Sequence, residues 1–306
     1  MTLAIIEKEP KLGSHTSTRN SGVLHAGIYY EPGSIKANLC VPGKRMWESY
    51  CKERNIDLQE TGKFIIGETT EDTPRLQILK ERGEQNKVPG LELIDYATAK
   101  NIEPRLEMKN HDAMILHSKG TSTMDIHGAI RELEKDCKDF DNIDILTSKE
   151  IVGVIENTTK NATVQIADSS QNLSSFSKYY QKKQNLSCKT IINCSGLYAD
   201  KIASSLGCEE KFGTLFIKGN YIKAKKDLLG QDFPRTLFYP VPPFATKSAM
   251  LGVHTTTGSD WVKIGPSGFP GFWREDYGMM QNFKLKETAK TLFGYLQIMT
   301  TPNRQA

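Results

Sequence analysis

The spacing of apolar residues predicts both helices and strands in the first half of the chain. Ile126, Ile130, Leu133 and Cys137 recur every three or four residues, as the apolar face of a helix does. Short apolar runs bounded by turn residues indicate strands instead. By these criteria helices are predicted over 34–54, 74–87, 96–101 and 124–139, and strands over 3–7, 63–67 and 112–117.

Short β-type runs dominate the second half of the chain. A polar insert from Ser169 to Ser187 is expected to be a hairpin extension or a loop. Beyond Gly207, glycines and prolines separate the β-runs, which favours an antiparallel sheet. Helices alternating with strands, followed by strands alone, predict a fold class of α/β plus α+β. The predicted strands are 143–147, 150–156, 162–167, 190–193, 214–224, 236–241, 248–254 and 260–265.

Composition narrows the class of protein only loosely. The 306 residues are 38% apolar and 25% charged, which is typical of a globular protein. The net charge of +4 is dispersed along the chain, so no basic stripe indicates nucleic acid. No apolar run approaches the roughly 20 residues of a transmembrane helix. The six cysteines form no CxxC pair, so we expect reduced thiols, with neither a metal site nor a disulfide.

The segment behind the first strand carries the strongest chemical signal. The strand over 3–7 ends at Glu7, and a loop of small hydroxyl residues, Arg19 and Gly22 follows it. A carboxylate there accepts hydrogen bonds from ribose hydroxyls, and a glycine-containing loop brings backbone amides close to phosphates. This arrangement predicts the second half of a dinucleotide site. Its first half, a strand and a glycine-rich turn, is expected upstream and is absent from these 306 residues.

Several segments together resemble one enzyme family. They are His15–Cys40, Gly62–Ile66, Asn86–Leu91, Ile192–Asp200, Tyr239–Pro242, Leu251–His254 and Lys263–Pro266. In these segments the chain resembles the L-2-hydroxyglutarate dehydrogenases, FAD enzymes of the D-amino-acid-oxidase-like superfamily, and the resemblance extends to Tyr277. Where the family has Gln-Thr-Gly, this chain has Thr16-Ser17-Thr18, so a glycine is replaced by a β-branched residue.

The resemblance implies two interleaved domains. An FAD-binding Rossmann-like domain, lacking its first strand and glycine-rich turn, is expected over 1–60 and 118–210. A substrate domain built on an antiparallel sheet is expected over 61–117 and 211–306. Because the family also ends with a further strand, a substrate segment and a helix against the flavin, the chain is expected to correspond to the middle of the enzyme.

The resemblance also implies a reaction. The expected activity is oxidation of L-2-hydroxyglutarate to 2-oxoglutarate, with hydride passing to FAD and an external electron acceptor reoxidising the flavin. Two alternatives stay open. One is another FAD-dependent oxidoreductase of the superfamily that acts on glycerol 3-phosphate or amino acids, and the other is a truncated product that binds no FAD. Eukaryotic family members are mitochondrial, and a cytoplasmic location is expected otherwise.

The expected cofactor residues lie in three parts of the chain. Glu7 is expected to accept hydrogen bonds from the FAD ribose, although a solvated carboxylate is as common at strand ends. Ser195 and Gly196 follow a predicted strand and precede a helix, where amides face a phosphate, although an ordinary βα turn has the same residues. The resemblance adds further residues along the pyrophosphate and flavin edge. These are His15, Arg19, Asn20, Ser21, Gly22 and Val152.

Two histidines are the candidate catalytic residues. His25 is expected beside the flavin ring, where an imidazole takes the hydroxyl proton as hydride leaves the substrate. His254 ends a predicted strand and is expected to face the substrate, binding a carboxylate or sharing the acid–base role. A structural, hydrogen-bonded histidine remains the alternative for both. Tyr221 and Tyr239 are expected to cap the substrate pocket, although tyrosines on strands are usually core residues.

Overall fold

The structure is a computed structural model that describes residues 2–158, 161–169, 182–208, 214–229, 233–242, 252–278 and 282–300. It divides into two compact units, each assembled from separate stretches of chain. Unit 1 comprises Met1–Arg19, Ile130–Phe216 and Pro270–Asn303. The described part of unit 2 comprises Asn20–Ala129 and Ile217–Phe269.

The helices predicted in the first half of the chain are confirmed. α1 begins after Ser34, whose Oγ accepts a hydrogen bond from the Ala37 amide at 3.2 Å. A C-terminal helix, α8, was not predicted. The α-helices are α1 Ile35–Glu53, α2 Thr73–Gln85, α3 Tyr96–Ile102, α4 Ile126–Lys138, α6 Ala199–Ser205, α7 Lys226–Leu229 and α8 Leu285–Thr300, and the 3-10 helices are η1 Thr70–Asp72 and η3 Gly196–Tyr198.

Unit 2 is built on a seven-stranded sheet in the order β12-β15-β14-β13-β4-β6-β5. The pairs β5–β6, β4–β6, β13–β14 and β14–β15 are antiparallel, whereas β4 and β13 run parallel. The predicted antiparallel sheet is therefore confirmed, with one parallel pair at its centre. Its strands are β4 Lys63–Ile66, β5 Leu91–Ile94, β6 Ile115–Ser118, β12 Phe216–Lys225, β13 Leu237–Pro240, β14 His254–Thr257 and β15 Trp261–Gly271.

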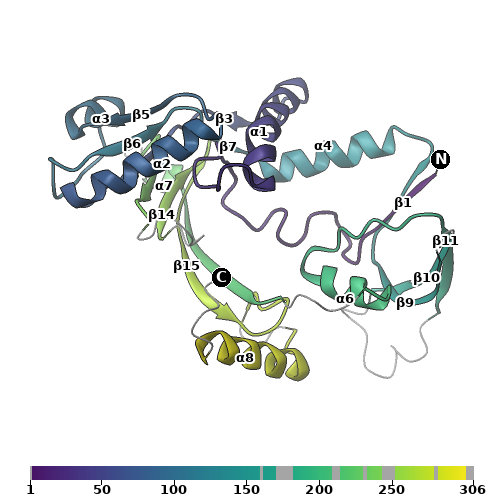
Figure 1. The fold of residues 1–306 in the computed structure, drawn as a ribbon. Helices are drawn as coiled ribbons and strands as arrows, with labels where there is room; N and C mark the ends of the chain where they lie inside the picture. The colour runs from purple at the N-terminus through teal and green to yellow at the C-terminus, as the bar shows by residue number, and fades with distance from the viewer. Residues whose placement is uncertain are drawn as a thin grey trace. The chain divides into compact units, whose positions relative to one another are not determined.

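Helices cover both faces of this sheet, as Figure 1 shows for α2 and α3. On one face Leu76 and Leu79 of α2 pack with Ile65 of β4. On the other face Ala99 of α3 packs with Phe64. Because alternate residues of a strand point to opposite faces, Lys63 shares the α2 face with Ile65. A smaller sheet, β2-β7-β3, completes the unit, formed by β2 Val23–Leu24, β3 Leu58–Gln59 and β7 Ser122–Met124.

Unit 1 contains two small sheets. β1 Leu3–Ile6 pairs in parallel with β8 Ile143–Leu146, as expected for a nucleotide-binding domain. Next to them, β9 Lys149–Asn157, β10 Ala162–Asp168 and β11 Gln184–Cys188 form an antiparallel sheet. The mixed α/β fold is therefore confirmed, with sheets of both kinds.

One predicted strand is wrong. Residues 190–193 are not in a strand, and Ile192 is 75% exposed. The nearby strand is instead β11, Gln184–Cys188, most of which was predicted to belong to the polar insert. It forms despite its polar composition, because its backbone pairs with that of β10. The run predicted over 248–254 lies largely outside the described residues, and β14 begins at His254.

The predicted domain limits and the two units divide the chain differently. Residues 20–60 and 118–129 were assigned to the cofactor domain, and their contacts group them with unit 2. Residues 270–300 were assigned to the substrate domain, and they group with unit 1. The chain passes between units at Arg19, inside the predicted cofactor loop.

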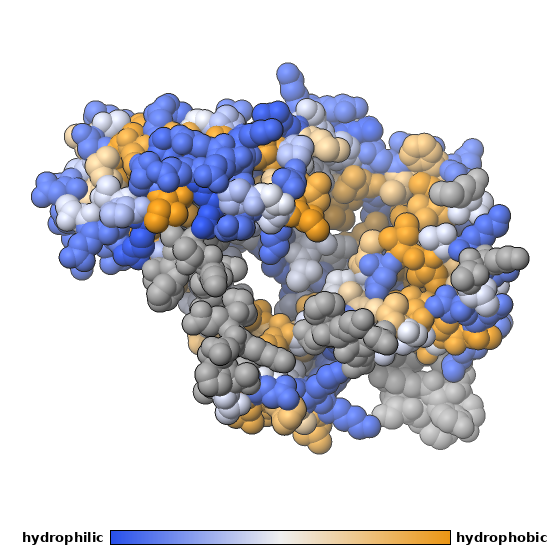
Figure 2. Space-filling view, viewed as in Figure 1, coloured by the Kyte–Doolittle hydropathy of each residue, from blue (hydrophilic) through white to orange (hydrophobic). Residues whose placement is uncertain are grey.

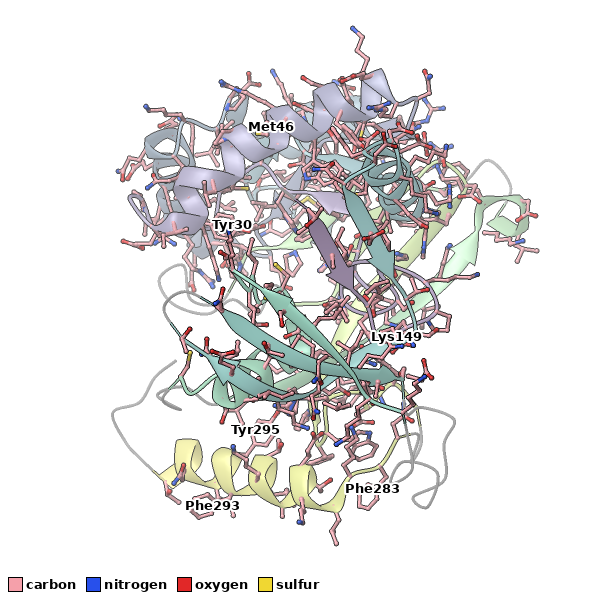
Figure 3. The ribbon with its side chains drawn as sticks, turned by 90° about the vertical axis from the view of Figure 1, so that its right-hand side faces the viewer. Tyr30, Met46, Lys149, Phe283, Phe293 and Tyr295 are labelled. Atoms are coloured by element: carbon pink, nitrogen blue, oxygen red, sulfur yellow. The ribbon has the colours of Figure 1, made fainter. Side chains whose placement is uncertain are left out.

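Helix α8 is amphipathic. Tyr295 donates a hydrogen bond to the carbonyl of Phe216, the first residue of β12. Phe293, on another side of the helix, is 61% exposed (Figure 3). Further apolar residues of α8 reach the surface, where they colour that helix orange in Figure 2. None of the described helices is long and apolar enough to cross a bilayer.

Candidate functional site

Lys63 is the most unusual side chain of unit 2. It is 1% exposed, and the structure gives it no ion pair with any described carboxylate. Its Nζ lies 4.6 Å from the centre of the Tyr29 ring and 5.0 Å from the centre of the Tyr239 ring. Aromatic faces attract a cation but provide no counter-charge. Burial therefore lowers the pKa of Lys63 to about 7, an effect that the nearby Cys40 thiol partly offsets.

The local sequence explains how a lysine reaches this position. Gly62 precedes β4 with a φ of 62°, so the strand starts from a left-handed turn. β4 then pairs with β13 in a register that sets Lys63 opposite Leu237 and Ile65 opposite Tyr239. The Lys63 stem consequently lies among apolar residues, and its ammonium reaches the two tyrosine rings.

His254 begins β14 and stacks on Tyr239 with 3.9 Å between ring centres. Its Nδ1 lies 3.0 Å from the Gly252 carbonyl oxygen, which only accepts hydrogen bonds. Nδ1 therefore carries the proton in the neutral ring, and Nε2 keeps its lone pair. Nε2 is buried without a hydrogen-bond partner among the described residues. Burial lowers the pKa of His254, although the bond to Gly252 raises it, so the neutral ring is favoured.

His25 lies in the same cluster. Burial, together with the charges of Lys63 and His254, lowers the pKa of His25 to about 3. Its backbone carbonyl accepts a hydrogen bond from Cys40 Sγ at 3.3 Å, which ties this loop to α1. At pH 7 the imidazole is neutral. Its side chain is partly exposed, as is that of Tyr221, so the cluster reaches the surface of unit 2 beside these two residues.

Three hydroxyl groups near these residues lack hydrogen-bond partners among the described residues. They are Tyr29 Oη, Tyr239 Oη and Thr256 Oγ1. Tyr239 Oη lies near Thr256 but not in hydrogen-bonding geometry. Buried polar atoms are rarely left unpaired in folded proteins, so these hydroxyl groups are available to hydrogen-bond water or a ligand. The Tyr221 ring lies edge-on to His254, with 6.3 Å between centres. Unit 2 therefore brings together all four predicted catalytic and pocket residues, His25, His254, Tyr221 and Tyr239.

The predicted cofactor loop of unit 1 is held by an ionic network. Lys8 Nζ contacts Glu9 and lies 2.6 Å from Glu275. His15 uses both ring nitrogens, Nε2 at 2.8 Å from Glu9 and Nδ1 at 2.9 Å from Tyr277 Oη. Hydrogen bonds from Lys8 and Tyr198 outweigh burial and lower the pKa of Glu275. Glu9, His15 and Glu275 have the spacing of metal ligands, but the Lys8 ammonium already forms an ion pair with each of the two carboxylates.

The other predicted cofactor residues of unit 1 have the following environments. Glu7 accepts the Glu9 amide through one oxygen at 2.8 Å, and its other oxygen has no described partner. Gly196 has a φ of 52°, and a Cβ there would lie 4.0 Å from Thr16 Oγ1, so the two predicted segments adjoin. Ser195 donates to Asn193 at 2.6 Å, and Val152 is 40% exposed on β9.

The Arg19–Gly22 turn spans the boundary between the units. In unit 1 the Arg19 guanidinium lies 4.0 Å from the centre of the Tyr277 ring, and Nε donates to Ser14 O at 2.9 Å. In unit 2 Asn20 Oδ1 accepts from the Gly22 amide at 2.9 Å, and Ser21 Oγ accepts more weakly from Val23. Gly22 has a φ of 80°, a conformation that favours glycine. Cofactor contacts of these residues remain a prediction.

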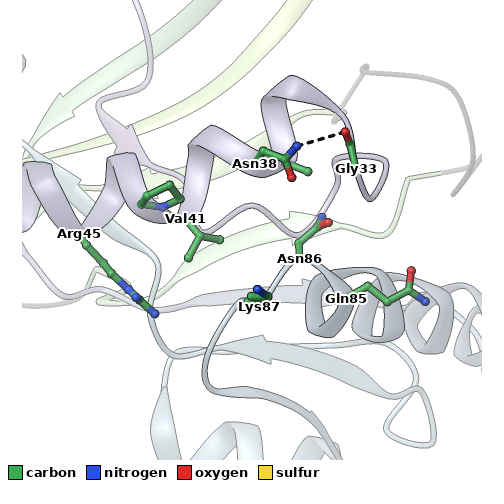
Figure 4. Close-up of a pocket in the computed structure, with 9 residues that line it drawn as sticks. Gly33, Asn38, Val41, Arg45, Gln85, Asn86 and Lys87 are labelled. Carbon is green, nitrogen blue, oxygen red and sulfur yellow. Dashed lines mark hydrogen bonds between the residues drawn. The ribbon is translucent and has the colours of Figure 1, made fainter.

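The cavity in Figure 4, about 280 Å³, lies between α1 and the turn after α2. Pro42 inside α1 has no amide hydrogen, so the Asn38 carbonyl on this side loses its helical partner. None of the nine lining residues belongs to the predicted site. They are Gly33, Ala37, Asn38, Val41, Pro42, Arg45, Gln85, Asn86 and Lys87.

Sequence reasoning missed several residues of both clusters. Lys63 was included in the resembling segment Gly62–Ile66 without a role, although a lysine that opens a strand of apolar residues is a detectable signal. Tyr29 was likewise in the cofactor loop but not singled out. Glu275 had no sequence signal, because its ion-pair partner Lys8 and its hydrogen-bond donor Tyr198 lie far from it in the sequence.

Comparison with known proteins identifies the class to which this fold belongs. The sequence profile of the FAD-dependent oxidoreductases matches residues 1–298. L-α-glycerophosphate oxidase from Mycoplasma pneumoniae superposes with a TM-score of 0.74 at 20% identity, covering 94% of this chain and 71% of that one. L-proline dehydrogenase from P. horikoshii gives 0.71 at 16% identity, covering 95% and 69%. The class is therefore that of the FAD-dependent oxidoreductases.

Closer relatives specify the family. The L-2-hydroxyglutarate dehydrogenase of Indibacter alkaliphilus is 33% identical over 296 residues, which are 95% of this chain and 67% of the relative. The mitochondrial enzymes of Nematostella vectensis and Homo sapiens are each 32% identical, over 95% and 90% of this chain. This chain belongs to the L-2-hydroxyglutarate dehydrogenase family. It spans 62% of the Nematostella relative and 57% of the human one.

Proposed function

We propose that this protein oxidises L-2-hydroxyglutarate to 2-oxoglutarate with FAD as the hydride acceptor. The observation that carries the proposal is the cluster of Lys63, His25 and His254 in unit 2, found in a chain whose curated relatives are named for this reaction. Oxidation of a 2-hydroxy acid requires a base for the hydroxyl proton and a cation for the carboxylate. The cluster provides both types of group within one unit.

His254 is the better placed base. Its Nδ1–H is fixed on the Gly252 carbonyl, so Nε2 accepts the C2 hydroxyl proton while the hydride leaves C2. The stacked Tyr239 ring fixes the plane of the imidazole. His25, the other expected catalytic residue, is a weaker base because the pKa of its imidazole is about 3. It is proposed to contact the substrate as a neutral hydrogen-bonding group.

The residues of unit 1 fit part of the proposed cofactor site. One carboxylate oxygen of Glu7 has no partner among the described residues and can accept a hydrogen bond from a ribose hydroxyl, and Gly196 leaves open space beside Thr16. Ser195 is the N-cap of η3 and Gly196 is its first residue, and η3 leads into α6, so these amides can face an anion. Bound FAD supplies the hydride acceptor. His15 and Arg19, by contrast, already have protein partners. The cofactor would therefore contact the carbon edge of the His15 ring and the terminal nitrogens of Arg19.

A substrate panel tests the proposal. The protein is supplied with FAD and an artificial electron acceptor, and turnover is measured with L-2-hydroxyglutarate, its D-enantiomer, glycerol 3-phosphate and amino acids. The proposal expects turnover of the L-enantiomer, with 2-oxoglutarate as the product. Turnover of glycerol 3-phosphate or amino acids alone would assign the chain to another activity of the superfamily. A protein that retains no flavin after gel filtration would support the non-catalytic alternative.

The external electron acceptor and the location complete the proposal. Reduced FAD has to pass its electrons to a further acceptor, because the substrate provides only the donor. The eukaryotic relatives are named mitochondrial, and the relative from Indibacter alkaliphilus is bacterial. We therefore assign a mitochondrial location to this protein only if its source is eukaryotic, and a cytoplasmic one otherwise.

A further inference from the structure

A buried lysine without an anionic partner requires a physical explanation. Moving an ammonium group into an apolar interior costs several kcal/mol unless a counter-charge or hydrogen bonds replace water. The structure gives Lys63 two aromatic faces and no described carboxylate partner. Such a residue is kept where a ligand supplies the missing charge.

The groups that face Lys63 from every neighbouring element are neutral at pH 7. Burial raises the pKa of both tyrosines and of the thiol, and it lowers the pKa of both histidines. None of them supplies a negative charge to the ammonium. These groups are His25 after β2, Tyr29 in the loop before α1, Cys40 on α1, Tyr239 on β13 and His254 on β14.

We propose that Lys63 binds a carboxylate of the substrate, together with the hydroxyl groups of Tyr29 and Tyr239. This inference rests on the function proposed above and deepens it, because it assigns the anion-binding residue of that site. Both hydroxyls are buried and lack described partners, so each has a proton free to donate. A carboxylate has about four lone-pair positions, enough for the ammonium and both hydroxyls.

The position of the hydroxyl to be oxidised follows from the same arrangement. Tyr239 touches both Lys63 and His254, and the charge of Lys63 lowers the pKa of His254. A substrate held through its carboxylate on Lys63 therefore lies next to His254 Nε2. His254 Nε2 accepts a hydrogen bond from the substrate hydroxyl. One ligand therefore provides partners for His254 Nε2, for the two tyrosine hydroxyls and for the Lys63 ammonium.

The proposal has a consequence for proton uptake. Near pH 8 Lys63 is mostly neutral in the empty site, whereas a bound carboxylate favours the ammonium. Carboxylate binding at pH 8 therefore takes up close to one proton, about 0.9 for a group with a pKa near 7, and close to none at pH 6. The neighbouring histidines and tyrosines contribute little, because the directions of their pKa shifts keep them neutral at pH 8.

Calorimetric titration with glutarate tests the assignment without turnover. The probes are glutarate, its neutral isostere glutaramide, and inorganic phosphate, each titrated into the full chain at pH 6 and pH 8 in buffers of different ionisation enthalpy. We expect glutarate to bind with proton uptake at pH 8 and glutaramide to bind far more weakly. Phosphate binding as tight as that of glutarate would overturn the carboxylate assignment.

Variants separate a binding role from a structural one. Lys63→Met should weaken glutarate binding by at least about thirty-fold, the effect of removing one partner of a buried charged pair. Lys63→Arg keeps the charge at every pH, so binding should persist while proton uptake at pH 8 disappears. Lys119→Met removes the same charge from a side chain that is 52% exposed, and it should change neither quantity. Equal binding by wild type and Lys63→Met would overturn the proposal.

A substrate analogue without the distal carboxylate identifies which carboxylate is bound. If Lys63 holds the carboxylate next to the hydroxyl, Lys63→Met should weaken L-2-hydroxyvalerate and L-2-hydroxyglutarate binding equally. If it holds the distal carboxylate, only the second should weaken. Either result supports the assignment, and an unchanged affinity for both contradicts it. Glutarate binding that depends on Lys63 in a protein without L-2-hydroxyglutarate turnover would refute the proposed function while leaving the anion site intact.

Discussion

Replacing Lys63 by methionine should stabilise the protein at neutral and acidic pH but not at alkaline pH. Methionine retains the length of the buried stem and removes the ammonium. Burial lowers the pKa of Lys63 from 10.5 to about 7. At about 1.4 kcal/mol for each unit, that fall corresponds to about 5 kcal/mol of destabilisation in the charged form. Cation–π contacts with Tyr29 and Tyr239 favour the charged form, so about 5 kcal/mol is the upper limit of this cost.

The sign of the pH dependence follows from proton binding. Between about pH 7 and the unfolded-state pKa of 10.5, the unfolded chain holds a proton on Lys63 that the folded chain has released. The cost of burying Lys63 is therefore complete below pH 7, and stability recovers by at most about 1.4 kcal/mol per pH unit above it. The gain from Lys63→Met should be largest at pH 6 and should shrink steadily toward pH 9.

Hydrogen exchange is the appropriate assay because the chain divides into two compact units and this method reports on each of them separately. Protection of amides in β4 and β13 reports on unit 2, measured at pH 6, 7, 8 and 9 after correction for intrinsic exchange. Lys119→Met serves as the control, since its exposed ammonium should add no such slope. A gain from Lys63→Met that is the same at every pH, or a loss at pH 6, would refute the reasoning.

Other substitutions test the remaining parts of the account. His254→Asn removes the Nε2 lone pair and should slow flavin reduction, measured by stopped flow, by at least about 100-fold. If the rate of flavin reduction falls no further than in Tyr221→Phe, His254 is not the base. Gly22→Ala places a side chain on a backbone with φ of 80° and should lower the free energy of unfolding by about 1–2 kcal/mol. Gly43→Ala is the control: it lies inside α1, an added Cβ meets nothing within 4 Å, and the free energy of unfolding should rise by up to about 1 kcal/mol. Both are measured by thermal unfolding. Glu275→Gln should destabilise unit 1 at pH 7. Because the folded-state pKa of Glu275 is lowered from 4.5, the difference from wild type should shrink as the pH falls from 4.5 through the folded-state pKa; a difference that stays constant on acidification below pH 4.5 would contradict the ionic role.

The elements with a clear apolar period were predictable from the sequence. α4 was predicted from Ile126, Ile130 and Leu133, and it forms within two residues of the predicted limits. The strand predicted at 190–193 does not form, because an apolar run shows only that a segment is able to pair. Pairing also requires a neighbouring strand. β11 has such a neighbour in β10, whereas Ile192 lies exposed outside any described strand.

The candidate site was predictable to the extent that its chemistry is local. His25 and His254 were identified by their residue type and by family resemblance, and the structure brings them into one cluster. The tautomer of His254 was beyond sequence reasoning, because it depends on a contact with the Gly252 carbonyl. The role inferred for Lys63 likewise depends on what surrounds it. Its depressed pKa results from burial between two rings that come from distant parts of the chain.

Flavin reduction in a single turnover tests the central claim most directly. Protein loaded with FAD is mixed anaerobically with L-2-hydroxyglutarate carrying either hydrogen or deuterium at C2, and loss of the oxidised flavin absorption is followed. The account expects reduction by the L-enantiomer, slower with deuterium, because the C2 hydrogen is transferred as hydride. Flavin that stays oxidised in a protein shown to hold FAD, with 2-hydroxy acid present in excess, would contradict it.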